Sequence, residues 1–467
     1  MQIPILNGIY ADGSPDFRTS YPRNLVPVPK QNGISQGYLR PGDGIVELGT
    51  GPGTDRGGIN WNGTLYRVMG TKLVSISQGN IVTTIGDVGG GSRVTFDYGF
   101  DYLAIASGGR LYLYDGSTLA QVTDPDLGTV LDVVWVDGYY MTTDGEFLVI
   151  TELDDPFAVN PLKYGSAEAD PDPIKALVKL RNEVYALNRN TIEVFDNVGT
   201  TGFPFQRVPG AQIQKGCVGT HACCQFMDAI AFVGGGRNEA PSVWLGVNGT
   251  AQKIASREIE EILSGYTETE LSDAYLEERI YLFHDQLVIH LARHTLVFDG
   301  SASRVMSVPV WFSLASTLVG DGIWNAQSIV WAYDRWNVGH PSTSQFGFLD
   351  HNNVNTHWGD TIGWDFGTTI VYNQNAGAIF HELELVGLTG ATAFGVDPTI
   401  WTQYSLDGQT WSVEKPIRAG GSGARDKRLV WLQQGWMRTR RMQRFRGTSD
   451  APIAIAALEA RIEALAR

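Results

Sequence analysis

Short runs of β-branched and aromatic residues alternate with turn residues through the first three quarters of the chain. Each run ends at Gly, Asn or Asp and is followed by a second run, which predicts a strand, a turn and a second strand. The unit occurs seven times, in the ranges 63–76, 101–116, 137–151, 181–197, 227–246, 277–299 and 327–349. Each unit is a small antiparallel sheet with too little area to stand alone. The pattern predicts an all-β protein.

The spacing of these units predicts a β-propeller. Equivalent apolar positions follow one another at intervals of 36 to 50 residues: Leu65, Leu103, Tyr139, Val184, Ile230, Ile280 and Ile329. Propeller blades repeat at about 40 to 50 residues, and packing such sheets around an axis buries their apolar positions. We expect six or seven blades. Because no WD or kelch signature accompanies the repeat, unrelated hairpins in one or two sandwiches are the alternative.

Beyond about residue 350 the predicted strands become longer, in the ranges 368–373, 380–388, 399–414, 428–434 and 438–446. This change predicts a separate β-sandwich. The expected organisation is an N-terminal arm at 1–45, a propeller-like domain at 46–349 and a C-terminal sandwich platform at 350–467. The last residues, 451–467, form either a final strand or a short helix. Only 255–264 has helical periodicity, with Ser256 as N-cap, and we expect this helix to cover a sheet edge.

Composition agrees with a strand-rich protein. The 467 residues include 55 Gly, and 18% are charged, a balance that favours turns and strands over long helices. The formal charge of −15 argues against nucleic-acid binding over the whole surface. The first ten residues lack a secretory signal pattern, and no apolar run approaches the roughly 20 residues that span a bilayer. We expect synthesis in a cytoplasm and no membrane insertion.

Two groups of residues resemble metal ligands. His290 and His294 have the spacing of a zinc-binding helix, but the flanking runs predict strands, so the pair brackets a turn. The second group is Cys217, His221, Cys223 and Cys224, which lack the paired CxxC spacing of zinc sites. Three cysteines are also too few for a disulfide framework. We expect buried thiols and no metal.

No catalytic centre is predicted. The segment 405–411 (SLDGQTW) is one residue short of the Asp-box turn of sialidase-like propellers, so Asp407 and Gly408 are expected to form a two-residue hairpin turn. The acidic pairs Asp154–Asp155 and Asp170–Asp172 fit ordinary turns. No GxSxG, Walker or GxGxxG motif stands between a strand and a helix. We therefore expect a protein that is not an enzyme and needs no cofactor.

Aromatic and basic residues gather in the last third. The tryptophans are Trp324, Trp331, Trp336, Trp358, Trp364, Trp401 and Trp411, which either stack on sugars or fill the core. The basic residues, with only Asp426 against them, are Arg425, Lys427, Arg428, Arg438, Arg440, Arg441, Arg444 and Arg446. Alternation along a strand would divide them between two faces, so they do not form one phosphate track. We expect an interface for an acidic protein surface or a DNA backbone; the alternative is a solvated face.

The collinear order of several segments carries a resemblance. They are 24–30 (NLVPVPK), 37–42 (GYLRPG), 65–73 (LYRVMGTKL), 214–219 (QKGCVG), 240–245 (APSVWL), 259–267 (IEEILSGYT), 288–299 (VIHLARHTLVFD), 380–386 (FHELELV) and 426–431 (DKRLVW). In this order the chain resembles the packaged-DNA stabilisation proteins of short-tailed phages, the tail hub or nozzle subunits that close the portal channel. The cysteine cluster, the loop at 234–236 and the Ala-rich end depart from the family pattern.

The resemblance implies a structural virion protein of the phage tail. Its expected partners are five further copies in a six-fold ring, the portal adaptor, a tail needle or plug, tailspikes or fibres, and packaged DNA that passes without sequence-specific binding. Six copies would carry a formal charge of −90, and an acidic channel wall would repel phosphate and let DNA slide. The alternative function is a glycan-binding or glycan-cleaving propeller, which would need two carboxylates at a defined separation for cleavage.

Overall fold

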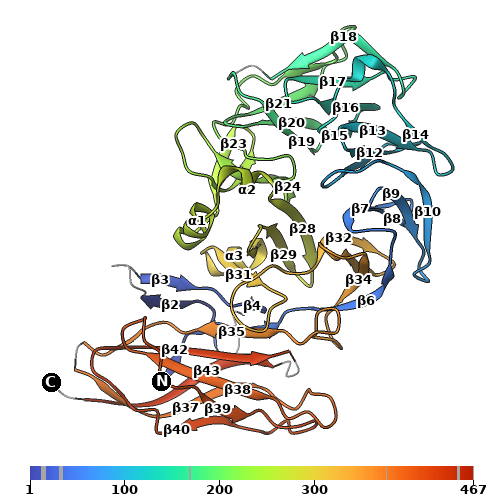
Figure 1. Ribbon diagram of the computed structural model, residues 1–467. Helices are drawn as coiled ribbons and strands as arrows, with labels where there is room; N and C mark the ends of the chain where they lie inside the picture. Colours follow the sequence, from blue (N-terminus) through green and yellow to red (C-terminus); the bar gives the residue numbers. More distant parts are fainter. Residues whose placement is uncertain (12–16, 31–34, 168–169, 375, 450–452, 466–467) are drawn as a thin grey trace.

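The computed structural model describes residues 1–11, 17–30, 35–167, 170–374, 376–449 and 453–465. Strands dominate these residues, and they divide into a propeller and a sandwich that lie one above the other in Figure 1. The all-β prediction, with a propeller followed by a sandwich, is confirmed.

Seven antiparallel sheets, each of four or five strands, form the propeller in the described residues, so it has seven blades. The first two blades contain β7 (Asp55–Trp61), β8 (Thr64–Met69), β9 (Lys72–Ile76) and β10 (Val82–Asp87), then β11 (Thr95–Tyr98), β12 (Leu103–Ser107), β13 (Arg110–Tyr114) and β14 (Leu119–Gln121). The next two contain β15 (Asp132–Val136), β16 (Tyr139–Thr143), β17 (Phe147–Thr151) and β18 (Val159–Ser166), then β19 (Ile174–Leu180), β20 (Glu183–Asn188), β21 (Ile192–Asn197) and β22 (Phe205–Arg207).

The last three blades complete the circle. The fifth contains β23 (Gly216–Cys217), β24 (Cys223–Phe226), β25 (Ala229–Gly235), β26 (Ser242–Val247) and β27 (Thr250–Lys253), and the sixth contains β28 (Tyr275–Tyr281), β29 (His284–His290), β30 (Thr295–Asp299) and β31 (Val310–Leu314). The seventh contains β32 (Gln327–Ala332), β33 (Arg335–Gly339), β34 (Gln345–Asp350) and, from the start of the chain, β6 (Gly44–Thr50). Each of the seven repeats seen in the sequence therefore lies in one blade.

Carboxylates on the inner strands link one blade to the next. The Asp97 side chain on β11 accepts a hydrogen bond from the Trp135 backbone N–H on β15, at 2.6 Å. Asp132 on β15 accepts one from Leu177 on β19, at 2.8 Å. Such bonds satisfy inner-strand N–H groups that no neighbouring strand reaches.

The same device recurs on the other side of the ring. Glu277 on β28 accepts a hydrogen bond from the Ile329 N–H on β32, at 2.7 Å. The Gln327 side chain on β32 then donates to the carbonyl of Asp55 on β7, at 2.9 Å, which joins the last blade to the first. Charged and amide side chains on the inner strands therefore help to hold the seven sheets in a closed ring.

The propeller is closed by a strand from the opposite end of its sequence. Strand β6 pairs with β34, with Val46 opposite Phe348 and Glu47 opposite Gly347. At Gly347 an added Cβ would lie 2.2 Å from the carbonyl oxygen of Val46, so only glycine fits there without a shift of the backbone. The outer strand of the seventh blade is thus supplied by residues that precede the first blade.

The sandwich also draws strands from both ends of the chain. One sheet contains β1 (Gln2–Ile3), β4 (Leu25–Pro29), β5 (Gly37–Pro41), β37 (Ala378–Leu388), β40 (Leu429–Leu432), β41 (Trp436–Met437) and β43 (Ala454–Ala464). The second contains β35 (Gly363–Gly367), β36 (Val371–Tyr372), β38 (Thr399–Ser405), β39 (Lys415–Arg418) and β42 (Arg440–Thr448). Their shared core includes Leu39, Phe380 and Phe445. Of residues 451–467, for which the sequence leaves a strand or a helix open, the described part contains the strand β43, whereas 451–452 and 466–467 lie outside the described residues.

A hairpin and a buried ion pair connect the two domains. The hairpin of β2 (Gly8–Ala11) and β3 (Phe17–Ser20) lies between the propeller and the sandwich in Figure 1. Beside it, the Arg23 guanidinium donates to the Asp365 carboxylate of β35, at 2.6 Å. The buried Asn24 side chain donates to the carbonyls of Ala315 and Gly363, which belong to the two domains.

Helices are few, and the prediction was incomplete here. Helix α1 (Arg257–Ser264) has Ser256 as its N-cap, as expected, and packs beside β26. Two further helices, α2 (Glu268–Ser272) and α3 (Gly300–Met306), and the 3-10 turn η1 (Pro125–Leu127) were not predicted. Each is shorter than two helical turns, which is too short to show a helical repeat of apolar residues.

The strand predicted at 399–414 was too long. Strand β38 ends at Ser405, because the Asp407 carboxylate accepts hydrogen bonds from the N–H groups of Gln409 and Thr410 and closes a loop. A bridge pairs Ser405 with Trp411, so five residues separate the paired positions. The two-residue hairpin turn expected at Asp407 and Gly408 is therefore wrong.

Candidate interaction surfaces

The basic residues of the last third occupy three different environments. The buried one is Arg441 on β42, whose side chain is packed between the rings of Phe380 and Tyr404, at 4.3 and 3.9 Å from the ring centroids. Its guanidinium donates to the Gln434 carbonyl and to the Gln443 side chain. Burial lowers the pKa of Arg441 to about 10. Arg441 therefore supports the sandwich core and cannot contact a partner.

Two arginines of β42 are half-buried and bind carboxylates of their own chain. Arg446 forms a bidentate pair with Glu414 and stacks over the Trp401 ring at 4.5 Å. Arg444 lies 3.9 Å from the Asp365 carboxylate at the domain junction. Arg440, also half-buried, pairs with Tyr372 of β36 across the sheet. The carboxylate contacts of Arg444 and Arg446 are therefore made within their own chain.

The four remaining basic residues are exposed and flank one sheet edge. Arg425, Lys427 and Arg428 directly precede β40, and Arg438 directly follows β41. Arg428 pairs with Glu384 of the neighbouring strand β37. Between these cations two large apolar side chains are exposed, Leu432 at 66% and Trp436 at 57%. We call Arg425, Lys427, Arg428, Leu432, Trp436 and Arg438 the basic edge.

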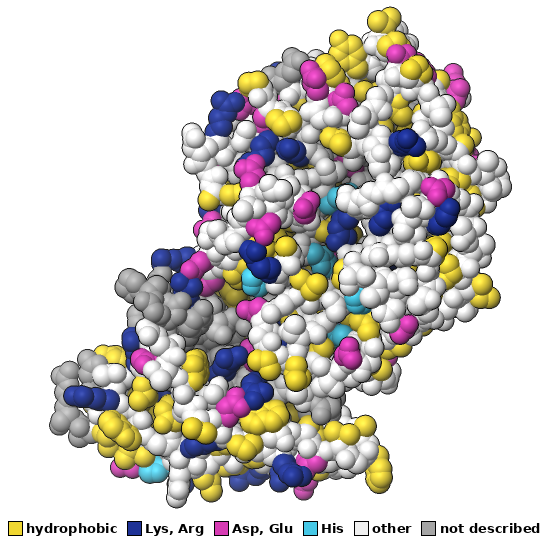
Figure 2. Space-filling model, in the orientation of Figure 1, with side chains coloured by type: hydrophobic (Ala, Val, Ile, Leu, Met, Phe, Trp, Pro, Cys, Tyr) yellow, Lys and Arg dark blue, Asp and Glu magenta, His cyan; other side chains and the backbone are white. Residues whose placement is uncertain are grey.

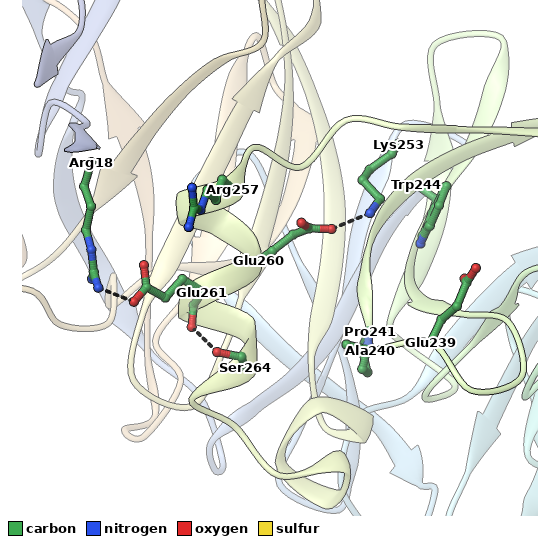
Figure 3. A pocket seen from close by; sticks show the side chains of 10 residues that line it. All are labelled: Arg18, Glu239, Ala240, Pro241, Trp244, Lys253, Arg257, Glu260, Glu261 and Ser264. Carbon is green, nitrogen blue, oxygen red and sulfur yellow. Dashed lines mark hydrogen bonds and ion pairs between the residues drawn. The ribbon is translucent and has the colours of Figure 1, made fainter. Parts of the chain in front are cut away.

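A cavity of about 840 Å³ lies between α1 and the fifth blade. Figure 3 shows two ion pairs in its wall, Arg18 with Glu261 at 2.5 Å and Lys253 with Glu260 at 2.5 Å. The Trp244 ring lies beside Lys253, with the ammonium 5.1 Å from the ring centroid. The Arg18–Glu261 ion pair in the wall of this cavity thus joins the N-terminal hairpin to α1.

A second cavity, of about 620 Å³, lies at the junction of the two domains. Its wall includes Tyr21, Asp365, Trp411 and Arg444. The Tyr21 hydroxyl donates to Ser256 at 2.6 Å and lies 3.3 Å from Glu258, and burial raises its pKa. The cavity is lined by groups that hold the hairpin, α1 and the sandwich together.

The histidine pair brackets a turn, as predicted. His290 ends β29, and its Nε2 donates to the Glu277 carboxylate at 2.7 Å, with its ring stacked on Trp324. His294 precedes β30 and contacts the Tyr266 hydroxyl at 2.6 Å. The two rings thus have separate partners on different elements.

The cysteine cluster is built into the fifth blade. Cys217 and Cys223 are buried, Cys224 is half-buried, and all three are free thiols. Burial lowers the pKa of the neighbouring His221 to about 4, so its ring is neutral at physiological pH. Across the described part of the chain, no three His, Cys, Asp or Glu side chains are arranged to hold a metal ion.

The acidic pairs lie in loops. Asp155 accepts a hydrogen bond from the Phe157 N–H, and Asp172 accepts one from Asn190. Asp170 forms an ion pair with Arg237. Asp154 is exposed. These contacts are those of turn and loop residues, and they do not point two carboxylates into a shared cleft.

The tryptophans are divided between the domains. Trp324, Trp331, Trp336 and Trp358 belong to the seventh blade or its flanking loops, whereas Trp364, Trp401 and Trp411 belong to the sandwich. Trp324 and Trp364 are buried, and Trp331, 43% exposed, packs edge-on against Trp336. They therefore do not make one platform for a sugar.

Charge is divided unevenly between the propeller and the sandwich. Residues 46–349 contain 35 acidic and 19 basic side chains, a formal charge of −16, whereas residues 350–467 contain 12 of each. Within the second and third blades, residues 97–166 hold 12 acidic and 2 basic side chains. Figure 2 shows several Lys and Arg side chains on the sandwich. Counting charge by repeat would have found this asymmetry from sequence.

Comparison with known proteins covers both domains. A family model described as "Bacteriophage P22 Gp10, beta-propeller" matches residues 1–354, and one described as "Bacteriophage P22 Gp10, beta-sandwich" matches residues 363–463. The chain belongs to the bacteriophage P22 Gp10 family. The tail hub protein gp10 of Salmonella phage P22 is 28% identical over 484 aligned positions, which cover 99% of each chain. The resemblance inferred from the ordered segments is thereby confirmed.

Two solved structures are similar to this chain only at low TM-scores. The N-terminal domain of Nup159 is 9% identical, with a TM-score of 0.41 over 70% of this chain and 99% of that one. The Pan2 WD40 domain of Neurospora crassa is 9% identical, with a TM-score of 0.43 over 65% and 90%. In the described residues, no helix is long and apolar enough to cross a membrane.

Proposed function

We propose that this chain is a structural subunit of a phage tail hub and not an enzyme. Family membership over both domains is the observation that supports this role. In this proposal six copies form a ring below the portal and its adaptor, in the tail of the virion. The ring retains packaged DNA, opens a channel for its exit, and carries a plug or needle and tailspikes or fibres.

The charge of the chain supports passage of DNA without sequence-specific binding. The propeller carries a formal charge of −16, and an acidic surface repels the phosphate backbone rather than holding it. The exposed cations at the basic edge, Arg425, Lys427, Arg428 and Arg438, are the part of the predicted interface that a partner can reach. We propose that they bind an acidic protein surface within the tail.

Electron microscopy of phage particles tests the proposed function. A phage whose copy of this gene carries an early stop codon should package DNA, lose it afterwards, and lack the lower part of the tail. Complementation with the intact gene should restore complete, filled particles. Complete tails that hold their DNA without this protein would contradict the proposal, and glycan-array binding would then test the alternative sugar-binding propeller.

A further inference from the structure

The second and third blades expose a surface that is both acidic and apolar. In an antiparallel blade the first and third turns lie at the same end, which brings together the β11–β12 and β15–β16 turns and the loops that follow β13 and β17. Phe100 of the first turn is 89% exposed and packs edge-on against Trp135 of the next blade. Leu153, 55% exposed, lies against the Asp137–Gly138 turn.

Exposed carboxylates surround these two apolar side chains. Asp101 adjoins Phe100, Asp115 lies in the neighbouring loop, and Asp137, Asp154 and Asp155 surround Leu153. We call Phe100, Leu153 and these five aspartates the acidic face. Of the two basic residues in the range 97–166, Lys163 is paired with Glu152, and Arg110 begins β13 at the opposite end of its blade. Lys179 of the next blade lies over the Trp135 ring, but its ammonium donates to the Trp135 carbonyl and is 3.8 Å from Asp97. The acidic face therefore presents carboxylates around an exposed apolar centre.

The basic edge has the complementary composition. Four cations flank Leu432 and Trp436. Asp426 is exposed among them and Arg428 is paired with Glu384, so this surface combines exposed apolar side chains with a net positive charge. The two surfaces lie at opposite ends of the molecule, the acidic face on the blades at the top of Figure 1 and the basic edge at the bottom, beside β40. They cannot meet within one chain, whereas two chains arranged head to tail bring them together.

We propose that the acidic face of one copy docks on the basic edge of the next copy in the tail ring. The inference rests on the proposed ring and names the two surfaces that form it. A ring made of identical subunits needs two different, complementary patches on each subunit, and these two are complementary in charge and each has an apolar centre. Pairing of two acidic faces, or of two basic edges, would bring like charges together and is disfavoured. This repulsion fixes the direction of the contact.

Charge exchange tests the contact in particles. The acidic-face variant is Asp101→Lys with Asp154→Lys, and the basic-edge variant is Arg425→Glu with Lys427→Glu; no side-chain hydrogen bond of the folded chain involves these four residues in the described structure. Supplied alone to a phage that lacks the intact gene, each variant should lower the yield of complete tails at least tenfold. Supplied together, they should restore it, because each reversed surface then faces its opposite on the other variant.

A matched control carries the same change of charge on the other end of the same blades. Asp126→Lys with Glu146→Lys, both exposed, should leave the yield within twofold of the unchanged protein. Equal loss with the control, or no rescue by the mixture, would overturn the proposal. Loss of DNA from complete tails carrying the basic-edge variant, without loss of the ring, would instead assign the basic edge to the DNA backbone and also overturn it.

Cross-linking separates the contact from the proposed function. Particles carrying Asp154→Cys with Lys427→Cys, treated with a bismaleimide, should give a ladder of covalent oligomers. The native cysteines should react slowly, because Cys217 and Cys223 are buried and burial raises the pKa of the half-buried Cys224 thiol. Either single variant, or Glu146→Cys with Lys427→Cys, should give at most a background band. An immunoblot shows whether particles contain the protein: protein without a ladder overturns the contact, and particles without the protein overturn the tail role and the ring contact together.

Discussion

The Asp132 carboxylate accepts a hydrogen bond from the Leu177 backbone N–H, 2.8 Å away, across the boundary between the third and fourth blades. A second N–H, that of Val133, donates to the other carboxylate oxygen. Burial nevertheless raises the pKa of Asp132 to about 7. The folded chain thus binds a proton on the Asp132 carboxylate more tightly than the unfolded chain does, since Asp residues in an unfolded chain titrate near pH 3.9.

This linkage predicts a pH dependence of stability. Asp132 increases the free energy of unfolding below about pH 4, where it is protonated in both states. This contribution is about 1.4 kcal/mol for each unit by which the folded pKa exceeds the unfolded one, and it is lost as the pH rises to about 7. In Asp132→Asn the free energy of unfolding in urea should change less between pH 5 and pH 8 than in the unchanged chain. The exposed Asp101→Asn should behave like the unchanged chain, and equal slopes for all three proteins would contradict the prediction.

Reversal of charge at Arg441 should unfold the sandwich rather than weaken an interface. A glutamate between Phe380 and Tyr404 would bury an unpaired carboxylate, which costs about 3 kcal/mol or more. The Arg441→Glu chain should therefore melt well below the unchanged chain by differential scanning calorimetry. Arg438→Glu, on the exposed edge, should shift the melting temperature by about 2 °C or less. Similar melting temperatures for the two variants would contradict the claim that Arg441 stabilises the sandwich core.

Closure of the propeller depends on the absence of a side chain at Gly347. Gly347→Ala places a Cβ 2.2 Å from the Val46 carbonyl oxygen and must push β6 away from β34. We expect a loss of about 1–3 kcal/mol in the free energy of unfolding and faster hydrogen exchange in β6. Gly90→Ala is the control, because no atom lies within 4 Å of the Cβ added there. Unchanged exchange in β6 would contradict this account.

The β28–β29 hairpin turn should become more stable on substitution. Leu282 and Phe283 have φ values of +49° and +67°, which bulky side chains rarely adopt, and Phe283 is 96% exposed. Asn-Gly is the sequence that such turns favour. Leu282→Asn with Phe283→Gly should raise the free energy of unfolding by about 1 kcal/mol, measured by urea denaturation. A lower stability would show that the two side chains stabilise the fold.

Periodicity in the sequence was sufficient for the repeating part of the fold. The alternation in 277–299, for example, matches β28, β29 and β30, because each strand buries one set of side chains against its neighbours. The blade number stayed open between six and seven, since the outer strand of the last blade, β6, lies far from its partners in the sequence. Pairing between distant segments leaves no local pattern.

The surfaces were harder to predict than the strands. The sequence predicts one basic strand from Arg438 to Arg446. In the structure, however, Arg441 is buried between two aromatic rings, while Arg438 is exposed. Alternation along a strand assigns its side chains to two faces, but it does not show which of the two faces packs against a second sheet. The short helices α2 and α3 escaped detection for a related reason: capping by Thr267 and Asp299 defines them more than any apolar stripe.

Because β1 pairs with β43, β1 cannot join its sheet until β43 has been synthesised. The Met1 amino group donates to the Ala460 carbonyl, so this contact forms only after synthesis has passed Ala460. During translation β4 and β5 remain next to an incomplete sheet while seven blades are made after them. A chain that ends before β43 therefore has a sandwich that cannot be completed, so synthesis through β43 is a condition for a subunit able to assemble.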